Sequence, residues 1–299
     1  MRIGDYEPDA LAAQLAGDGV AFRTGPFVYR LRSDLPEIAQ PFATLYRDFP
    51  VSDDVLIDYH VRLAPSRERL RRIARQIVIR LDDDAILAPY PRRLAVPVLE
   101  WGLNACIYQN AHQYLVFHCA VVEKGGAAVL FPGWSGTGKT TLCAALVCKG
   151  WRLLSDELAV IRPSDGMVLP IARPLSLKNE SIDLIGRLAP GLVFGPRIGA
   201  TAKGVISHLR PPADSVARMD EPARPAAVMF IAFEPGQAAE RIAFSKARAF
   251  YYLADNSLNY QTRGRDGFDE LARLIDSCGC YAMRYSRLDD AIPIVEGIV

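Results

Sequence analysis

The sequence predicts an α/β protein that consists of two lobes. Three observations indicate this class. The chain has 299 residues, of which 50% are hydrophobic, strand-like segments alternate with helix-like segments, and the octet GWSGTGKT follows a short apolar strand and precedes a helix. We expect a smaller N-terminal α+β lobe at residues 1–95 and a mixed sheet flanked by helices at residues 96–299, with the proline-rich stretch 89–97 between them.

Alternating apolar and polar residues predict the elements of the first lobe. Strands with one buried face are expected at Phe27–Leu31, Ile57–Leu63 and Ile77–Leu81, with a short amphipathic helix at Ile38–Arg47. The segment Arg67–Arg75 is rich in arginine, and we interpret it as the solvated face of a helix. A docking surface for an acidic partner is the alternative.

The second lobe is predicted to begin with a buried helix at Leu94–His112, followed by a β-hairpin. The hairpin strands are Tyr114–Val122 and Ala127–Phe131, and the glycines between them are a turn signal. A turn centred on Gly125 and Gly126 pairs His118 with Gly133, whereas a turn one residue earlier pairs His118 with Phe131.

Four more elements follow the octet in the order that an alternating α/β lobe requires. They are a helix at Thr140–Lys149 that Gly150 closes, a strand at Trp151–Leu154, a strand at Ala226–Phe233 and a helix at Gly267–Ser277.

The octet fits G-x-x-x-x-G-K-[ST], the pattern of a phosphate-binding loop. Glycines let the backbone wrap so that successive N–H groups point at phosphates, and the N-terminus of the following helix adds its positive dipole. Lys139 is expected to reach the outer phosphates of ATP, and Thr140 to hold Mg²⁺. The residues expected to bind the nucleotide are Gly133, Ser135, Gly136, Thr137, Gly138, Lys139, Thr140 and Thr141.

An acidic pair, Asp156 and Glu157, ends the strand after the loop helix. Phosphoryl transfer uses one carboxylate to hold Mg²⁺ and another to take the proton of the attacking hydroxyl. Adjacent residues of a strand point to opposite sides, so we expect the two carboxylates to have different roles. Their division of labour stays open, and the metal-binding candidates are Thr140, Asp156 and Glu157.

His118 is the third catalytic candidate, with Asp156 and Lys139. Either hairpin register brings its imidazole to the mouth of the loop, where it can orient a carboxylate or stabilise charge on the moving phosphoryl group. Lys178 and Lys203 are candidates for a second basic group that neutralises phosphate oxygens. A solvated loop is the alternative for both lysines.

Composition excludes several classes of protein. The chain has 35 basic and 34 acidic residues, which gives no electrostatic support for a nucleic-acid partner or a membrane surface. No run approaches the roughly 20 apolar residues of a membrane span, and we expect no export signal. The 6 cysteines are scattered and indicate reduced residues of a cytoplasmic protein rather than a disulfide framework.

The segment FHCAVVEKGGAAVLFPGWSGTGKTTLCAALVCKGWRLLSDELAVI resembles the catalytic core of bacterial HPr kinase/phosphorylase. That family has a histidine before a strand, a phosphate loop, a helix that ends in glycine and an acidic pair on the next strand. The resemblance implies an active-site role for His118 and activation of a substrate serine by Asp156. It also implies that Asp156 and Glu157 lie near Mg²⁺.

The whole chain is most similar to the branch called HPr kinase-related kinase A, through the stretches RTGPFVYRLRS, LEWGLNACI, RPLSLKNESID and KGVISHLRPPADSVAR. Glu157 stands where the family has aspartate, and the glycine-rich segment tied to phosphorylase activity has no clear counterpart. The loop is also similar to that of ATP-dependent phosphoenolpyruvate carboxykinase, for which this chain is short. Related enzymes assemble into hexamers, which leaves a homo-oligomer open.

These features together predict an ATP- and Mg²⁺-dependent P-loop kinase that phosphorylates a hydroxyl, with serine in a protein or peptide as the expected acceptor. Two alternatives stay open: a kinase for a small hydroxyl-bearing metabolite, and a non-catalytic ATP-binding regulator.

Overall fold

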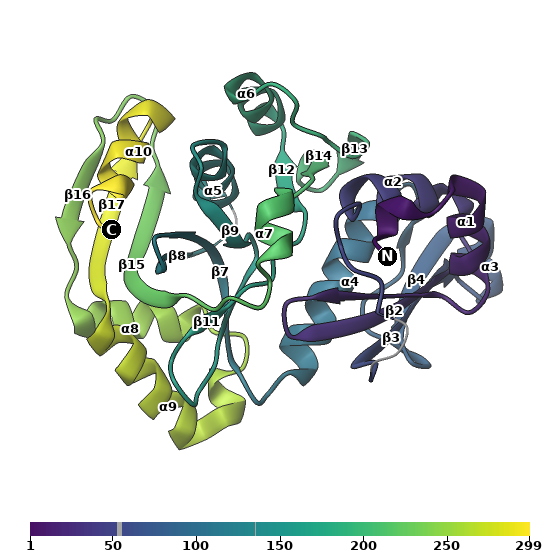
Figure 1. Ribbon diagram of the computed structural model, residues 1–299, viewed down its shortest axis with the longest axis horizontal. Helices are drawn as coiled ribbons and strands as arrows, with labels where there is room; N and C mark the ends of the chain where they lie inside the picture. Colours follow the sequence, from purple (N-terminus) through teal and green to yellow (C-terminus); the bar gives the residue numbers. More distant parts are fainter. Residues whose placement is uncertain (53–55, 135) are drawn as a thin grey trace.

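The computed structural model describes residues 1–52, 56–134 and 136–299 and shows an α/β protein with two lobes (Figure 1). The N-terminal lobe is purple to blue in the figure, and the C-terminal lobe is teal to yellow. Parallel and antiparallel strand pairs occur together with flanking helices, so the predicted α/β class with mixed sheets is confirmed.

Within the described residues, the first lobe contains a six-stranded sheet in the order β1-β2-β3-β4-β5, with β6 also paired to β4. The three strands predicted in this lobe correspond to β2, β3 and β4. The strands are β1 (Val20–Thr24), β2 (Phe27–Ser33), β3 (Tyr59–Pro65), β4 (Gln76–Leu81), β5 (Asp84–Ala85) and β6 (Tyr90–Pro91).

Short helices surround this sheet. Pro8 begins α1 because its fixed φ suits the first helical position and its missing N–H needs no partner there. The helix predicted near Ile38 is present as α2, and the arginine-rich segment contains α3. The helices are η1 (Ile3–Asp5), α1 (Pro8–Ala16), η2 (Pro36–Ile38), α2 (Ala39–Leu45), α3 (Arg69–Ile73) and η3 (Arg92–Leu94).

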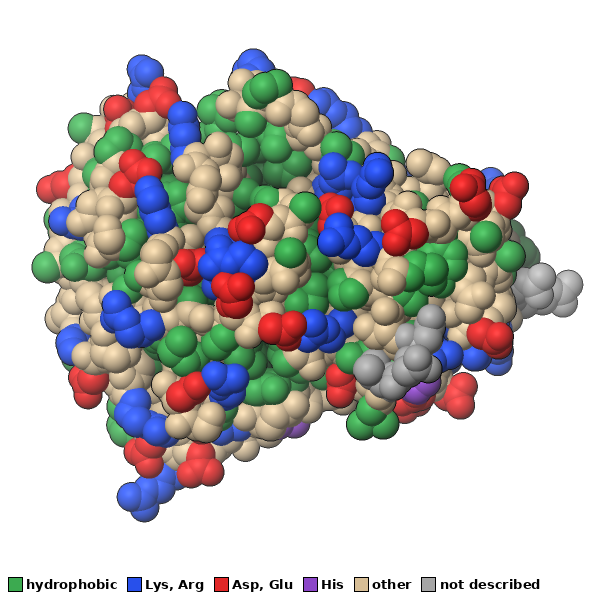
Figure 2. Space-filling view, in the orientation of Figure 1, with side chains coloured by type: hydrophobic (Ala, Val, Ile, Leu, Met, Phe, Trp, Pro, Cys, Tyr) green, Lys and Arg blue, Asp and Glu red, His purple; other side chains and the backbone are tan. Residues whose placement is uncertain are grey.

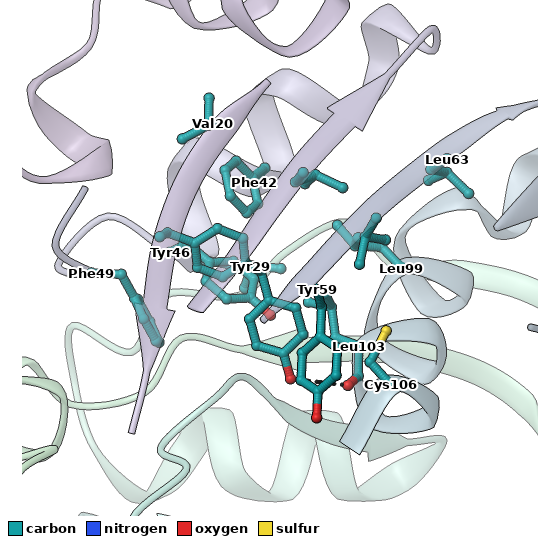
Figure 3. Close-up of a cluster of buried hydrophobic side chains, with 14 of the residues drawn as sticks. Val20, Tyr29, Phe42, Tyr46, Phe49, Tyr59, Leu63, Leu99, Leu103 and Cys106 are labelled. Carbon is teal, nitrogen blue, oxygen red and sulfur yellow. Dashed lines mark hydrogen bonds between the residues drawn. The ribbon is translucent and has the colours of Figure 1, made fainter. Parts of the chain in front are cut away.

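Helix α4 (Ala95–Asn110) is the buried helix that the sequence predicts, but it packs into the core of the first lobe, whereas we expected it to begin the second lobe. Figure 3 shows Leu99, Leu103 and Cys106 of this helix beside the aromatic rings of the strands. The hydroxyl of Tyr29 donates to the carbonyl of Leu103 at 3.1 Å. The same core includes Val116 and Leu158 of the second lobe, so α4 joins the two lobes.

Within the described residues, the second lobe contains an eight-stranded mixed sheet in the order β11-β10-β7-β8-β15-β17-β16, with β9 also paired to β7. Strands β8, β15 and β17 are parallel, so their carboxyl ends lie at one edge. The strands are β7 (Leu115–Lys124), β8 (Ala127–Pro132), β9 (Arg152–Ser155), β10 (Leu158–Ile161), β11 (Val168–Leu169), β15 (Arg224–Phe233), β16 (Glu240–Ala243) and β17 (Gly279–Tyr285).

Helices cover both faces of this sheet, as successive residues of β7 show. Ala120 and Val122 pack with α5 and α10, whereas Cys119 and Val121 pack with α8 and α9 (Figure 1). The helices are α5 (Lys139–Cys148), α6 (Glu180–Leu188), α7 (Ala213–Ala217), α8 (Lys246–Asp255), α9 (Tyr260–Ser277) and α10 (Leu288–Glu296).

A small antiparallel sheet lies between the lobes. Its strands are β12 (Leu175–Lys178), β13 (Ile198–Thr201) and β14 (Gly204–Leu209), in the order β12-β14-β13. Figure 1 shows it between α5 and the first lobe. This sheet carries both lysines that the sequence analysis singled out, because Lys178 ends β12 and Lys203 lies in the β13–β14 turn.

The surface has no dominant sign of charge on the face shown in Figure 2, where acidic and basic side chains are interspersed. Among the helices of the described residues, none combines the length and the apolar character that a bilayer-spanning helix needs. All 6 cysteines are free thiols, and all except Cys148 are buried.

Candidate active site

The glycine-rich segment forms a tight loop between the end of β8 and the start of α5. Gly133, Gly136 and Gly138 have φ angles of 142°, 97° and 95°, a region that L-residues with side chains rarely adopt. The glycines therefore permit the curled backbone that the motif predicts. Ser135, another predicted nucleotide-binding residue, lies outside the described residues.

The ends of two neighbouring strands hold this loop. At the end of β17, the hydroxyl of Tyr285 donates to the carbonyl of Gly138 at 3.2 Å. At the end of β15, the N–H of Phe233 donates to the carbonyl of Thr137 at 3.2 Å. A Cβ atom on Gly138 would overlap the Tyr285 hydroxyl, so this glycine is required by close approach as well as by its φ angle.

Lys139, the loop lysine, is buried, with 6% of its surface exposed. Its ammonium group donates to the carbonyls of Gly133 at 2.5 Å and Trp134 at 2.8 Å. Burial lowers the pKa of Lys139, and the charge of Glu157 opposes that shift. The cation is thus held by the backbone of the same loop that is predicted to bind phosphates.

Strand pairing brings the acidic pair beside the predicted histidine. Strands β9 and β10 both pair with β7, so the two acidic residues between them lie next to the β7 backbone. Leu158 is opposite His118, and the N–H of Cys119 donates to the carbonyl of Glu157 at 3.0 Å. The hairpin pairs Cys119 with Pro132, which is the register of a turn at Gly125 and Gly126.

Asp156 is almost fully buried, with 4% of its surface exposed. Its Oδ2 accepts from the N–H of Ser176 at 3.0 Å, and the nearby Thr140 side chain also favours the ionised form. Burial and then the charge of Glu157 outweigh these contacts and raise the pKa of Asp156 to about 6. This carboxyl group therefore lies against the loop threonine and has an unusually high affinity for a proton.

Glu157 is more exposed, with 29% of its side-chain surface accessible, and its Oε2 lies 3.1 Å from Nε2 of His118. Burial disfavours its charge, but the hydrogen bond with His118 and the charge of Lys178 prevail and lower the pKa of Glu157 to about 2. The two adjacent carboxyl groups thus have opposite shifts, because burial and the charge of Glu157 dominate at Asp156, whereas His118 and Lys178 dominate at Glu157.

Lys178 and Lys203 come together through Asn179. The side chain of Asn179 accepts from the N–H of Val205 at 2.9 Å and donates to the carbonyl of Lys203 at 3.2 Å. It occupies the space that a Cβ atom on Gly204 would need, where φ is 83°. Asn179 therefore fixes the turn that carries Lys203 beside the end of β12.

Two cavities meet at this site. The loop cavity, of about 690 Å³, is lined by the glycine-rich loop, the acidic pair, Ser176, α6, Phe233, Tyr285 and the start of α10. The interlobe cavity, of about 440 Å³, is lined by first-lobe residues, by α4 and by β13 and β14. Four residues line both cavities: His118, Glu157, Lys178 and Lys203. Asp156 lines the loop cavity but not the interlobe cavity.

The predicted residues that line the loop cavity are His118, Gly136, Gly138, Lys139, Thr140, Thr141, Asp156 and Glu157. Gly133 and Thr137 contribute backbone carbonyls to hydrogen bonds within and around the loop. The sequence reasoning missed Ser176, Phe233 and Tyr285, which no local pattern marks. His208 is buried outside the lining of the loop cavity, and burial lowers its pKa to about 4.

The oxygen ligands at the loop suit a hard cation. Within residues 1–52, 56–134 and 136–299, no group of three or more His, Cys, Asp or Glu side chains is arranged to hold a metal ion. Mg²⁺ in nucleotide sites is usually held by one or two carboxylates and by substrate phosphates, with water completing the shell. This requirement for one or two carboxylates is met by three residues that line one cavity: Thr140, Asp156 and Glu157.

Comparison with known proteins adds no family assignment: no protein-family model matches the chain, and no curated protein matches it. The function of the site therefore has to be inferred from its geometry and chemistry.

Proposed function

We propose that the protein is an ATP-dependent P-loop kinase, similar to HPr kinase, that transfers the γ-phosphoryl group to a serine hydroxyl of a protein or peptide. The observation that carries this proposal is the position of Glu157, His118 and Lys178 between two cavities. One cavity holds the phosphate loop, and the other is open to an acceptor. Phosphoryl transfer needs this arrangement, since the γ-phosphoryl group of ATP and the acceptor hydroxyl must come together where the two cavities adjoin.

The loop cavity would bind the nucleotide. The loop amides and the N-terminus of α5 favour phosphate oxygens, and Lys139 supplies a cation at the same place. Lys139 now donates to two loop carbonyls, which are neutral acceptors. Charged phosphate oxygens are stronger acceptors, so we expect Lys139 to turn to them when the nucleotide binds.

Thr140 and Asp156 would hold Mg²⁺, with Glu157 within reach of the same cavity. When bound, the ion neutralises charge on the phosphate oxygens. The buried carboxyl group of Asp156 must lose its proton for this role, and a nearby cation favours that loss.

Glu157 would accept the proton of the serine hydroxyl. The resemblance assigns this role to Asp156, whose pKa of about 6 is also better matched to it. Position takes precedence, however, because a base must first reach the proton. Glu157 lines both cavities, whereas Asp156 lines only one of the two. The negative charge of a bound triphosphate would also offset Lys139 and Lys178, which lower the pKa of Glu157.

In the transfer step, the serine oxygen forms a bond to the γ-phosphorus while the bond from that phosphorus to the bridging β–γ oxygen breaks. The bridging oxygen keeps the electron pair and leaves on ADP, and the hydroxyl proton goes to Glu157. His118 orients the carboxylate through its 3.1 Å contact. Lys178 would neutralise charge on the transferred group.

Calorimetry with ATP and Mg²⁺, followed by transfer of labelled phosphate, tests the proposal. The intact protein should bind ATP, Lys139→Met should bind it much more weakly, and Glu157→Gln should bind normally but fail to transfer. Absence of ATP binding by folded protein would contradict the proposal. A Glu157→Gln protein that keeps full transfer activity would exclude the assigned base, and label found only in low-mass products would favour a metabolite kinase.

A further inference from the structure

The interlobe cavity has an apolar wall that phosphoryl chemistry does not need. Tyr90 lies in the first lobe, and Trp101 and Tyr108 lie on α4. The rings of Tyr90 and Trp101 pack with centroids 5.3 Å apart, and all three aromatic side chains remain partly exposed. The larger aliphatic residues of the lining are Leu87, Leu94, Leu158, Ile206 and Leu258. Such walls favour an apolar or aromatic group of a ligand.

The charges of this cavity are concentrated where it meets the loop cavity. Lys178 and Lys203 lie there with Glu157, so two cations face one carboxylate. Lys203 is exposed in its turn, whose backbone is fixed by Asn179. If Lys178 neutralises the transferred phosphoryl group, Lys203 remains available for a negative group on the acceptor.

The volume limits the size of the group that enters. About 440 Å³ lies near the lower end of the roughly 300–1,000 Å³ found for small-ligand pockets. This space admits a few residues of an exposed segment and excludes a folded domain.

We infer that the acceptor serine lies in a short exposed segment beside an aromatic residue and an acidic residue, an inference that rests on the proposed kinase function. The aromatic side chain packs against Tyr90, Trp101 and Tyr108. The carboxylate pairs with Lys203, and the serine hydroxyl reaches Glu157 at the shared wall. The product is a phosphoserine in the same segment.

The test uses short acetylated and amidated peptides, X-Ser-Z, in which X and Z are phenylalanine, aspartate or lysine. The full chain is incubated with labelled ATP, Mg²⁺ and each peptide. Peptides with one phenylalanine and one aspartate should have a KM about tenfold lower than peptides with phenylalanine and lysine, which lack the ion pair. The KM should also be about tenfold lower than that of peptides with two aspartates, which lack the buried apolar side chain.

Matched variants separate the two contacts. Lys203→Gln should remove the preference for aspartate over lysine, with Lys149→Gln as the control on an exposed lysine elsewhere. Tyr108→Ala should reduce the preference for phenylalanine, with the exposed neighbour Gln109→Ala as its control. Tyr108→Ala should leave the ATP affinity measured by calorimetry unchanged, because Tyr108 lines the interlobe cavity but not the loop cavity.

The outcomes distinguish this inference from the kinase proposal. The inference about the acceptor is overturned if ATP binds normally and any one of three results is found. These results are phosphorylation with no peptide preference, no peptide phosphorylation, and label only in the low-mass products of an extract. Failure to bind ATP at all overturns the proposed function itself. A preference that survives Lys203→Gln and Tyr108→Ala also excludes the interlobe cavity as the acceptor site.

Discussion

Oε2 of Glu157 lies 3.1 Å from Nε2 of His118, and this contact links the bend before β10 to strand β7, where the two cavities meet. The histidine lowers the pKa of the glutamate and fixes its direction. A carboxylate held in this way is ionised and positioned to receive a hydroxyl proton, although its lowered pKa makes it a weaker base than Asp156.

Glu157→Gln should therefore lower kcat by about 10²–10⁴-fold, the usual contribution of a general base. ATP affinity should change by no more than a few-fold, because the amide keeps the shape of the side chain. Steady-state kinetics and calorimetry measure the two effects separately. Glu240→Gln is the matched control, since Glu240 lies on an exposed edge strand. Equal losses of ATP affinity and turnover would point to a binding role instead.

Asp156→Asn should stabilise the metal-free protein at neutral pH while it impairs Mg²⁺-dependent transfer. The folded-state pKa of about 6 lies above the ordinary value of 3.8, so folding favours the protonated form. The wild-type protein therefore loses stability as pH rises from about 4 through 6. The loss is on the order of 2–3 kcal/mol above that range.

Chemical denaturation in the presence of a chelator, at pH 4.5 and pH 8, checks this expectation. The asparagine variant should be more stable than the wild type at pH 8, and the difference should shrink at pH 4.5 because the wild-type carboxyl group is then protonated. A stability difference that does not depend on pH would show that the burial of charge is not its cause.

Gly138→Ala should weaken both folding and ATP binding more than Gly136→Ala. Both glycines have φ near 95°, so backbone strain of about 1 kcal/mol is common to both variants. Only at position 138 does the added methyl group also meet the Tyr285 hydroxyl, whereas the space around Gly136 is open. Tyr285→Phe removes that hydroxyl and should partly rescue Gly138→Ala.

Thermal unfolding and ATP titration are measured for Gly136→Ala, Gly138→Ala, Tyr285→Phe and the Gly138→Ala/Tyr285→Phe double variant. With the wild type, the last three variants form a complete double-mutant cycle. Tyr281→Phe serves as the control for loss of a tyrosine hydroxyl from the same strand. Strictly additive effects in the cycle would rule out the contact between positions 138 and 285 as the source of the difference.

Asn179→Ala should destabilise the turn that carries Lys203. The change removes hydrogen bonds to the N–H of Val205 and the carbonyl of Lys203, each worth about 0.5–1.5 kcal/mol. Asn179 also has a φ of 52°, a conformation that alanine adopts less readily than asparagine. Asn179→Asp keeps the acceptor and loses only the donor, so its effect should be smaller.

Hydrogen exchange at the amide of Val205, compared with thermal unfolding of the whole chain, measures this effect. The alanine variant should show faster exchange at Val205 with a small change in Tm, and the aspartate variant should lie between it and the wild type. Unchanged protection at Val205 would contradict the role given to Asn179.

The sequence by itself determined the α/β class, the strands β2, β3 and β4, the buried helix α4 and the β7–β8 hairpin. It also determined the loop, because the glycines and Lys139 are close together in the chain and their chemistry is local. Hairpin register then placed His118 near the loop with no long-range information, because pairing follows from the position of the turn.

Only the tertiary structure decided what surrounds the loop and which carboxylate faces which cavity. Tyr285 contacts Gly138 across 147 residues of sequence, and no spacing rule connects the two. The raised pKa of Asp156 arises from burial and the charge of Glu157, whereas the lowered pKa of Glu157 arises from His118 of β7 and Lys178 of β12. Burial and charge depend on neighbours in space, so a pair of adjacent acids in the chain cannot reveal how their roles divide.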